Sequence, residues 1–360
     1  MMNTIYKISL IAVSLSAMLT SAAWTAEREV IKARQDGKPV PENVMKDIYE
    51  KIKTPYKYGV VLKGEGGKLA DCPNVFRHNG KWYMMYVSYH GQGYETYVAV
   101  SDDLLEWTPL GRNLTFPKTG WDAWQADASI ALYDDAWDGS HELQQYDGKY
   151  WLSYIGGALQ GYEPDPLAIG IAWASEPAAA KEWTRIAENP VLARDQADIR
   201  PFENTTLYKS TIIWDKQETL GYPFVMYYNG KRADGSERIG MAVSKNMTRW
   251  TRYGTEPVID NGSGNSGDPQ ITRISDVWVM IYYGAFWKPK AFDTFACSYD
   301  MVTWTKWTGA HLVEPSEPWD NVFAHKPWVV FHNGMVYHFY CAEGNQGRVI
   351  AVATSKDLKK

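Results

Sequence analysis

KWYMMY, at residues 81–86, decides the fold because similar aromatic segments occur five times along the chain. The other copies are KYWLSY at 149–154, FVMYY at 224–228, WVMIYY at 278–283 and VYHFY at 336–340. Asn-Gly or Asp-Gly dipeptides precede three of the copies, at 79–80, 147–148 and 333–334. Such dipeptides between apolar runs indicate type I′ hairpin turns, because both central residues adopt positive φ. Each copy is therefore predicted to be one strand of a hairpin.

A second element follows each aromatic strand: a strand of small residues, a serine, a polar turn and a tryptophan. Complete copies are 98–101 with Trp107, 169–175 with Trp183, 239–244 with Trp250 and 295–298 with Trp304. The fifth copy, 350–358, ends before a tryptophan could occur. Five such units predict an all-β fold, a five-bladed β-propeller over residues 58–360, whereas a two-sheet sandwich would not explain five equivalent units. We expect Tyr58–Leu62 to supply the missing outer strand of the last blade.

Composition excludes several classes of protein. The 360 residues include 17 Trp, 24 Tyr and 10 Phe, and the net charge is −5. No basic field is therefore present to recruit nucleic acid or an anionic membrane. Three cysteines exclude a disulfide scaffold and a four-cysteine zinc module. One pair could form a bridge, but the interpretation we favour is small buried thiols within strands.

The N-terminal region is predicted to carry an export signal. Lys7, the apolar run 8–19 and the small residues 21–23 are typical of a cleavable signal peptide over residues 1–23. The run is too short to span a membrane, which takes about 20 apolar residues. Residues 24–57 form a charged extension with one predicted helix, which packs on the main domain or on a neighbouring subunit of a homo-oligomer. We expect a secreted or periplasmic protein.

The chemistry is expected at the propeller axis, where the innermost strand of each blade lies. Each unit places one polar residue before its aromatic hairpin, and these five residues differ in type. They are Asp71, Asp127, Glu203, Asp268 and His325. Carboxylates brought together repel, which raises at least one pKa and supplies an acid and a base. Structural alternatives remain open: Asp268 precedes a proline and suits a turn, Asp127 suits a strand-end cap, and His325 suits a structural role.

The five units resemble five-bladed propeller glycoside hydrolases, especially glycoside hydrolase family 43, with families 32, 117 and 130 as relatives. This resemblance implies that Asp71 is the general base, that Asp127 tunes and orients the acid, and that Glu203 is the general acid. The sequence departs from family 43 after Glu203, where Asn-Thr replaces Gly-Pro. The resemblance also implies that His325 faces the axis beside a calcium or sodium ion. By analogy with family 117, His325 could instead be the acid, alongside Asp268.

The reaction implied by the resemblance is single-displacement hydrolysis, with inversion at the anomeric carbon and exo action on plant or algal oligosaccharides. No cofactor is required beyond the axial ion. One rival is a family 130-like phosphorylase with cations from Arg200, Arg232, Arg238 and His325. Another is a propeller that binds sugar without catalysis, which would need similar residues in all five blades.

Loop aromatics suggest a sugar-binding surface, because indole and phenol rings stack on apolar faces and keep a polar tip. Trp121 belongs to this group, which lies beside the candidate axial residues. The expected substrate-binding residues are Tyr89, His90, Trp124, Arg200, Trp287 and Trp328. The alternative for each tryptophan is a space-filling role between blades. The insert 108–149 in the second unit is expected to close the site.

Overall fold

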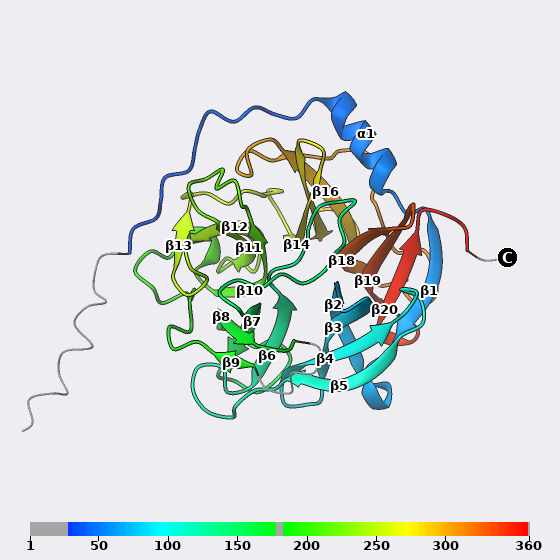
Figure 1. Ribbon diagram of the computed structural model, residues 1–360, viewed down its shortest axis with the longest axis horizontal. Helices are drawn as coiled ribbons and strands as arrows, with labels where there is room; N and C mark the ends of the chain where they lie inside the picture. Colours follow the sequence, from blue (N-terminus) through cyan, green and yellow to red (C-terminus); the bar gives the residue numbers. More distant parts are fainter. Residues whose placement is uncertain (1–27, 178–182, 359–360) are drawn as a thin grey trace, which may run out of the picture.

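The computed structural model describes residues 28–177 and 183–358. The predicted signal peptide, 1–23, lies outside the described residues. Within the described part of the chain, twenty strands form five four-stranded antiparallel blades around a common centre (Figure 1). One parallel bridge, between Glu95 and Ala126, joins the first two blades into a continuous sheet. The predicted all-β, five-bladed propeller is confirmed.

The blades follow one another along the chain, each running from the centre outward. Blade 1 contains β2 (Leu69–His78), β3 (Lys81–Tyr89), β4 (Tyr94–Ser101) and β5 (Thr108–Leu114). Blade 2 contains β6 (Gln125–Ile130), β7 (Tyr150–Gly157), β8 (Leu167–Ala174) and β9 (Thr184–Arg185). Blade 3 contains β10 (Thr206–Trp214), β11 (Phe224–Lys231), β12 (Glu237–Ser244) and β13 (Trp250–Tyr253). Blade 4 contains β14 (Asn265–Ile274), β15 (Val277–Ala285), β16 (Ala291–Ser298) and β17 (Thr305–Lys306).

The fifth blade is closed by a strand from the other end of the chain. It contains β18 (Phe323–His332), β19 (Met335–Gly344), β20 (Gly347–Thr354) and β1 (Tyr56–Leu62). Strand β1 pairs antiparallel with β20, so the expectation that 58–62 completes the ring is confirmed. Lys57 on β1 forms an ion pair with the fully buried Asp320. The two ends of the domain are thus held together by backbone pairing and by charge.

The aromatic segments occupy the second position of every blade. Three of the hairpin turns have the positive φ angles that their Asn-Gly or Asp-Gly sequences predict. The angles are 50° and 79° at 79–80, 54° and 67° at 147–148, and 51° and 72° at 333–334. The rings on β3, β7, β11, β15 and β19 are mostly buried between blades. The aromatic excess is therefore mainly structural.

The Ser-to-Trp element forms the turn between the third and fourth strands. Trp107, Trp250 and Trp304 each donate an indole N–H bond to the carbonyl three residues earlier, at 3.1, 2.8 and 3.0 Å. Trp183, which follows its serine by eight residues rather than six, donates to Asn113 Oδ1 at 2.9 Å instead. This bond ties blade 2 to blade 1.

The N-terminal extension wraps around the outside of the propeller (Figure 1). Ile31 bridges to Tyr253 of β13, and helix α1 (Glu42–Ile52) lies beside blades 4 and 5. The helix buries Met45, Ile48 and Ile52 in one hydrophobic cluster with residues of those blades. Of the two predicted partners for this helix, the structure therefore shows the main domain.

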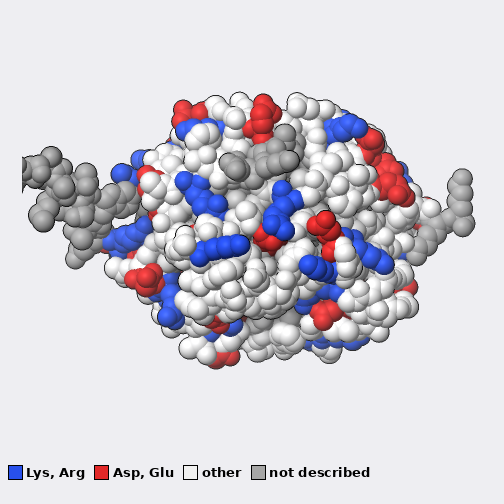
Figure 2. All heavy atoms as spheres, turned by 90° about the horizontal axis from the view of Figure 1, so that it is seen from below, with Lys and Arg blue, Asp and Glu red and all other residues white. Residues whose placement is uncertain are grey.

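Surface and thiol chemistry agree with the composition. Acidic and basic side chains are interspersed on the side of the molecule shown in Figure 2, without a continuous patch of one sign. No helix in the described ranges is long and apolar enough to cross a bilayer. Cys72, Cys297 and Cys341 are buried free thiols, as the interpretation we favoured predicts.

Candidate active site

Four of the five innermost strands carry a β-bulge at the same height. The pairing with the second strand shifts within 71–74 of β2, 207–210 of β10, 267–270 of β14 and 325–328 of β18. Three of the bulges contain a residue with positive φ directly before a proline: Cys72 (51°), Asp268 (46°) and Lys326 (61°). Bulges re-aim side chains and occur beside active sites. All three of these side chains line a single cavity.

This axial cavity is small, with a volume of about 70 Å³. It is smaller than most ligand pockets, which span about 300–1,000 Å³. Its walls come from all five blades and combine carboxylates, ammonium groups and aromatic rings. The lining residues are Cys72, Asp127, Ile155, Glu163, Tyr208, Lys209, Asn229, Glu237, Asp268, Tyr283 and Lys326. The axial cavity can therefore enclose a small polar ligand among ionisable groups.

Of the five predicted axial residues, two line this cavity: Asp127 and Asp268. Asp127 is 3% exposed, and neither of its carboxylate oxygens has a hydrogen-bond partner among the described residues. Burial raises the pKa of Asp127 to about 6. Asp268 accepts a bond from the Asn229 amide at 3.1 Å. The unpartnered carboxylate of Asp127 is thus available to a bound ligand.

Asp71 lies beside the axial cavity, with its carboxylate turned to cations. It accepts bonds from Lys326 and Arg348, both at 2.9 Å, and from the Tyr94 hydroxyl at 3.4 Å. Burial alone would raise the pKa of Asp71, but Lys326 and Arg348 hold it well below the usual range. Asp71 therefore positions two cations, and its carboxylate binds protons too weakly to be a good base.

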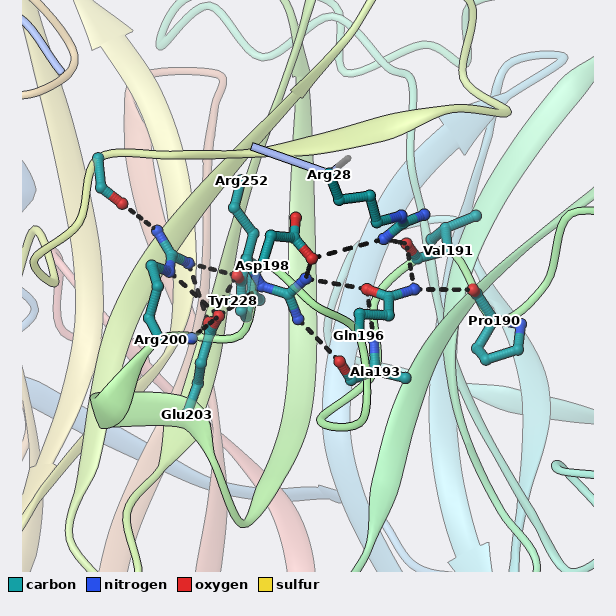
Figure 3. A network of polar contacts seen from close by, with 11 residues as sticks. Arg28, Pro190, Val191, Ala193, Gln196, Asp198, Arg200, Glu203, Tyr228 and Arg252 are labelled. Atoms are coloured by element: carbon teal, nitrogen blue, oxygen red, sulfur yellow. Dashed lines mark hydrogen bonds and ion pairs between the residues drawn. The ribbon is translucent and has the colours of Figure 1, made fainter. Parts of the chain in front are cut away.

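The structure does not bring Glu203 to the axial cavity. Figure 3 shows its carboxylate among arginines, at the end of a short 3₁₀ turn, Pro201–Glu203. Glu203 accepts bonds from Arg200 at 2.9 Å, from Arg252 at 2.5 Å and from the Tyr228 hydroxyl at 2.7 Å. Asp198 binds Arg252 from the other side at 2.6 Å. The side chains of Glu203, Arg252 and Asp198 are all almost fully buried.

These contacts favour the ionised form of Glu203, whereas a general acid must carry a proton. Burial would raise the pKa of Glu203, but Arg200 and Arg252 lower it below its usual value. The role of general acid that the resemblance implies for Glu203 therefore does not fit this lowered pKa. Arg200, expected to bind substrate, is itself buried, and it also donates to the carbonyls of Tyr253 and Gly254. The cluster ties blade 3 to the loop before it.

His325 does not fit a metal site. Its Nδ1 lies 3.3 Å from the Cys341 carbonyl oxygen, and its ring packs against Tyr283 and Phe323. Burial, with the charges of Lys326 and Arg348, lowers the pKa of His325 to about 3. Two fixed cations beside this imidazole oppose a bound cation, and a histidine with so low a pKa is unprotonated at neutral pH and so lacks the proton a general acid must supply. The described residues include no cluster of three or more metal-ligating side chains.

Two glutamates that the sequence reasoning missed line the axial cavity. Glu163 lies on the loop between β7 and β8, and Glu237 is the first residue of β12. Burial raises the pKa of each carboxyl to about 7. They come from different blades and face the same space. The pair therefore has the protonation range that acid–base catalysis at neutral pH requires.

Hydrogen bonds distinguish the two glutamates. Glu237 Oε2 accepts a bond from the Tyr283 hydroxyl at 2.6 Å, and Oε1 accepts one from the Asn265 amide at 3.2 Å. Asn265 is held in turn, since its carbonyl accepts a bond from the Trp287 indole at 3.0 Å. Within the described ranges Glu163 accepts no hydrogen bond. Donors favour an ionised Glu237, whereas Glu163 remains the easier group to protonate.

Two lysines balance the carboxylates. Lys209 donates to the Cys72 carbonyl at 3.0 Å, and Lys326 donates to Asp71. Burial works to lower the pKa of Lys209, but Cys72, Asp127 and other nearby groups raise it above its usual value. Both ammonium groups are therefore charged. They limit how far the carboxylate pKa values rise.

Most residues predicted to bind sugar have structural roles. His90 stacks on Tyr97 and contacts its hydroxyl at 2.8 Å, and Trp124 packs on Phe116. Trp328 is 3% exposed and donates to the Val75 carbonyl at 2.8 Å. The space-filling alternative therefore holds for both of these tryptophans.

Tyr89 is the exception, because its contacts lead to the loop that carries Glu163. Its ring contacts Tyr94 and Tyr162 edge-on, and Tyr162 directly precedes Glu163. Arg348 donates a hydrogen bond to the Tyr162 hydroxyl. The tyrosines and Arg348 thus join blades 1, 2 and 5.

The proposed phosphate-binding cations do not line the axial cavity. Arg238 is fully buried and donates to the backbone carbonyls of Glu237, Gly262 and Gly264. Arg232 and Arg238 lie near each other, but both pair with the carboxylate of Asp260. Their contacts are with the protein, so the structure contains no cradle built from these residues.

Part of the site could have been predicted from the positions of the prolines in the sequence. The residue directly before the proline enters the axial cavity in β2, β14 and β18, so Cys72 and Lys326 face it rather than their neighbours Asp71 and His325. For Glu163 and Glu237 no such signal exists, because both lie outside the innermost strands and only the closed ring brings them together.

No family model matches the chain, and no curated protein sequence matches it. The chain is similar to a solved structure described as a BT0996 complex with RGII, with 45% identity and a TM-score of 0.84, over 89% of this chain and 97% of that one. A structure described as "Glycoside hydrolase" shows 44% identity, with the same TM-score and coverage. Zg3597, a family 117 glycoside hydrolase from the marine bacterium Zobellia galactanivorans, shares the fold at 14% identity, with a TM-score of 0.57 over 85% of this chain and 90% of that one.

Proposed function

The chain belongs to the glycoside hydrolases with a propeller-like fold, and we propose that it removes single terminal sugars from an oligosaccharide at the axial cavity. The observation that carries this proposal is the pair of cavity glutamates, whose pKa values both lie near 7. The small volume of the axial cavity supports exo action, because it leaves no room for more than one sugar ring.

We assign the roles by the hydrogen bonds of each glutamate. Glu237, ionised beside Tyr283 and Asn265, is the base that activates water. Glu163, without such donors, carries the proton and delivers it to the leaving oxygen. Glycosidases divide the work between two carboxyl groups in this way. This assignment replaces Asp71 and Glu203 in the roles that the resemblance implied.

Other cavity residues are suited to stabilise the charge of the transition state or to bind sugar hydroxyls. The transition state of glycoside hydrolysis resembles an oxocarbenium ion, and carboxylates fixed nearby stabilise its positive charge. Asp127 and Asp268 are suited to this role, and Asp127 has free oxygens for a sugar hydroxyl. Lys209 is suited to donate a hydrogen bond to another hydroxyl. The cavity thus presents both negative carboxylates and a positive lysine, and this mixture of charges favours a sugar without net charge.

The stereochemistry of the reaction and the export of the enzyme are also proposals. We propose inversion, which rests on the resemblance to family 43, and proton NMR of the first-formed product anomer tests it. Export rests on the signal-like sequence at 1–23. An oligosaccharide derived from RGII is the first substrate to test, because the 45%-identical neighbour is described as a complex with RGII.

The test of function is a pair of conservative substitutions. Glu237→Gln and Glu163→Gln are each expected to lower kcat on the oligosaccharide by about 10²–10⁴-fold, because proton transfer contributes that much. Glu256→Gln, at an exposed site outside the axial cavity, is the matched control and should keep wild-type activity. Turnover close to wild type in either cavity variant would contradict the proposal.

A further inference from the structure

Glu163, the proposed acid, is placed by its loop rather than by contacts of its own carboxylate. The loop joins β7 to β8, and within the described ranges the carboxylate accepts no hydrogen bond. The backbone of Glu163 has a φ of 46°, in the left-handed region that few residues other than glycine adopt. A residue in this conformation persists only where its surroundings hold it there. The contacts of the neighbouring loop residues therefore decide where the carboxyl group of Glu163 lies.

Tyr162, the residue directly before Glu163, is held from blades 1 and 5. Arg348, the second residue of β20, donates a hydrogen bond from Nη1 to the Tyr162 hydroxyl. The guanidinium carbon of Arg348 lies 5.5 Å from the centre of the Tyr162 ring. The same ring packs edge-on against Tyr89 and Tyr94, with ring centres 5.8 and 5.3 Å apart. The position of Tyr162 is thus fixed at its hydroxyl and at its ring.

Arg348 is itself fixed by two carboxylates. Its Nε and Nη2 donate to Glu343 Oε2 at 3.1 and 2.6 Å, and its Nη1 donates to Asp71 Oδ2 at 2.9 Å. The side chain of Asp71 is fully buried, and that of Arg348 is 16% exposed. A guanidinium carries its donors in a rigid plane, so contacts on two sides set its orientation. Arg348 is therefore a rigid support for Tyr162.

The other side of Glu163 is anchored independently. Asp165 accepts hydrogen bonds from Lys231 Nζ at 2.8 Å and from the Tyr208 hydroxyl at 3.4 Å, both in blade 3. Glu163 thus lies between two anchored residues, one on each side. If the anchor at Tyr162 were released, Asp165 alone would not preserve the left-handed backbone at Glu163.

We propose that Arg348 is a positioning residue, which places the carboxyl group of Glu163 for proton transfer by holding Tyr162. Neither Arg348 nor Tyr162 lines the axial cavity, so both act through Glu163 rather than on the sugar. The inference rests on the proposed function, in which Glu163 is the general acid. A displacement of about 1 Å at a reacting group can cost about 10²-fold in rate. Displacing the acid slows only those glycosides whose leaving oxygen must be protonated.

The experiment uses two aryl glycosides of the sugar that the enzyme releases, one with an acidic phenol and one with a basic phenol. Tyr162→Phe removes the hydroxyl that Arg348 contacts and keeps the ring. Arg348→Lys keeps a positive charge beside Asp71 but cannot form the same set of bonds. Each variant is expected to lower kcat about 10- to 100-fold with the basic phenol. With the acidic phenol each should stay within about twofold of wild type, because that phenol leaves without protonation.

Tyr299→Phe is the matched control. Tyr299 is 37% exposed, follows the last residue of β16 and does not line the axial cavity, so its variant should match wild type on both glycosides. A second comparison adds Tyr162→Phe to Glu163→Gln. If Tyr162 acts through Glu163, the double variant should stay within about twofold of Glu163→Gln alone, because the effects of coupled residues are not additive.

A loss of the same size on both glycosides, or no loss in Tyr162→Phe, would overturn the positioning role. A further loss in the double variant would overturn it as well, because the contact would then support something other than the acid. Glu163→Gln separates this failure from failure of the proposed function. If Glu163→Gln loses kcat with the basic phenol while Tyr162→Phe follows wild type, the positioning role alone is rejected. If Glu163→Gln also follows wild type, the proposed function fails with it.

Discussion

At the scale of single residues, one hydrogen bond separates two otherwise similar carboxyl groups. Glu163 and Glu237 face the same cavity, and burial raises the pKa of each to about 7. The Tyr283 hydroxyl donates to Glu237 alone, at 2.6 Å. A donor stabilises the ionised form of its acceptor. The difference between base and acid in this site thus depends on Tyr283 and its amide neighbour Asn265.

Tyr283→Phe tests this role through the pH profile. The hydroxyl lowers the pKa of Glu237, so its removal raises that pKa and keeps the base protonated to higher pH. The acidic limb of kcat/KM is expected to move up by about one to two pH units, since a hydrogen bond to a charged group contributes about 1.5–3 kcal/mol. The measurement is kcat/KM from pH 4 to 9.

The matched control for this variant is Tyr282→Phe. Tyr282 is adjacent and buried, but it belongs to the hydrophobic cluster of blades 3 and 4 and does not line the axial cavity. Its pH profile should match wild type. An acidic limb that stays in place in Tyr283→Phe would show that Glu237 is not the ionised catalytic group.

At the scale of elements, the innermost strands explain which side chains enter the axial cavity. Bulges in β2, β14 and β18 turn the residue before a proline toward the axis. The hairpins could be predicted from sequence because Asn-Gly and Asp-Gly act locally. The inward direction of Asp268 was also predictable, since it precedes Pro269. The predicted axial positions Asp71 and His325 each lie one residue before the side chain that enters the axial cavity. The reason is that a bulge shifts the alternation of inward and outward side chains along a strand by one residue.

Glu203 was misassigned for a different reason. Its partners are Arg200, three residues earlier, and Arg252, on the far strand of the same blade. A glutamate in an apolar, Thr-rich segment suggests an active site when no cation that could pair with it is known. The local sequence contains no information about Arg252. Only the folded blade shows that this carboxylate is neutralised within the protein (Figure 3).

Glu203→Gln separates a structural role from a catalytic one. Removing one member of a buried ion-pair cluster leaves uncompensated arginines and is expected to cost about 3–5 kcal/mol in the free energy of unfolding. The folded fraction should keep wild-type kcat. Urea denaturation measures the first quantity, and active-site-normalised turnover measures the second.

Glu142→Gln is the comparison for Glu203→Gln. Glu142 pairs with Arg77 at 3.7 Å and is 37% exposed, so its loss should cost less than about 1 kcal/mol. If Glu203→Gln retained wild-type stability but lost turnover, Glu203 would regain the role of general acid.

At the scale of the whole molecule, the ring makes one site from five similar units. Each blade supplies different chemistry to the axial cavity: a thiol, carboxylates, lysines and two tyrosines. This asymmetry is what a single catalytic centre requires and a repeated sugar-binding surface does not. The five blades could be predicted from the repeats, and closure by β1 from the truncated last copy. The meeting of Glu163 and Glu237 could not, since a loop of blade 2 and a strand of blade 3 face each other only in the closed ring.

In the proposed mechanism, Glu163 donates the proton to the departing oxygen. The most direct measurement is kcat/KM of Glu163→Gln on a series of aryl glycosides of the released sugar, with phenol leaving groups of increasing pKa. Acidic phenols leave without protonation, so the variant should approach wild type with them and fall by about 10²–10⁴-fold with the most basic phenols. A loss of the same size across the whole series would contradict the assignment of Glu163 as the general acid.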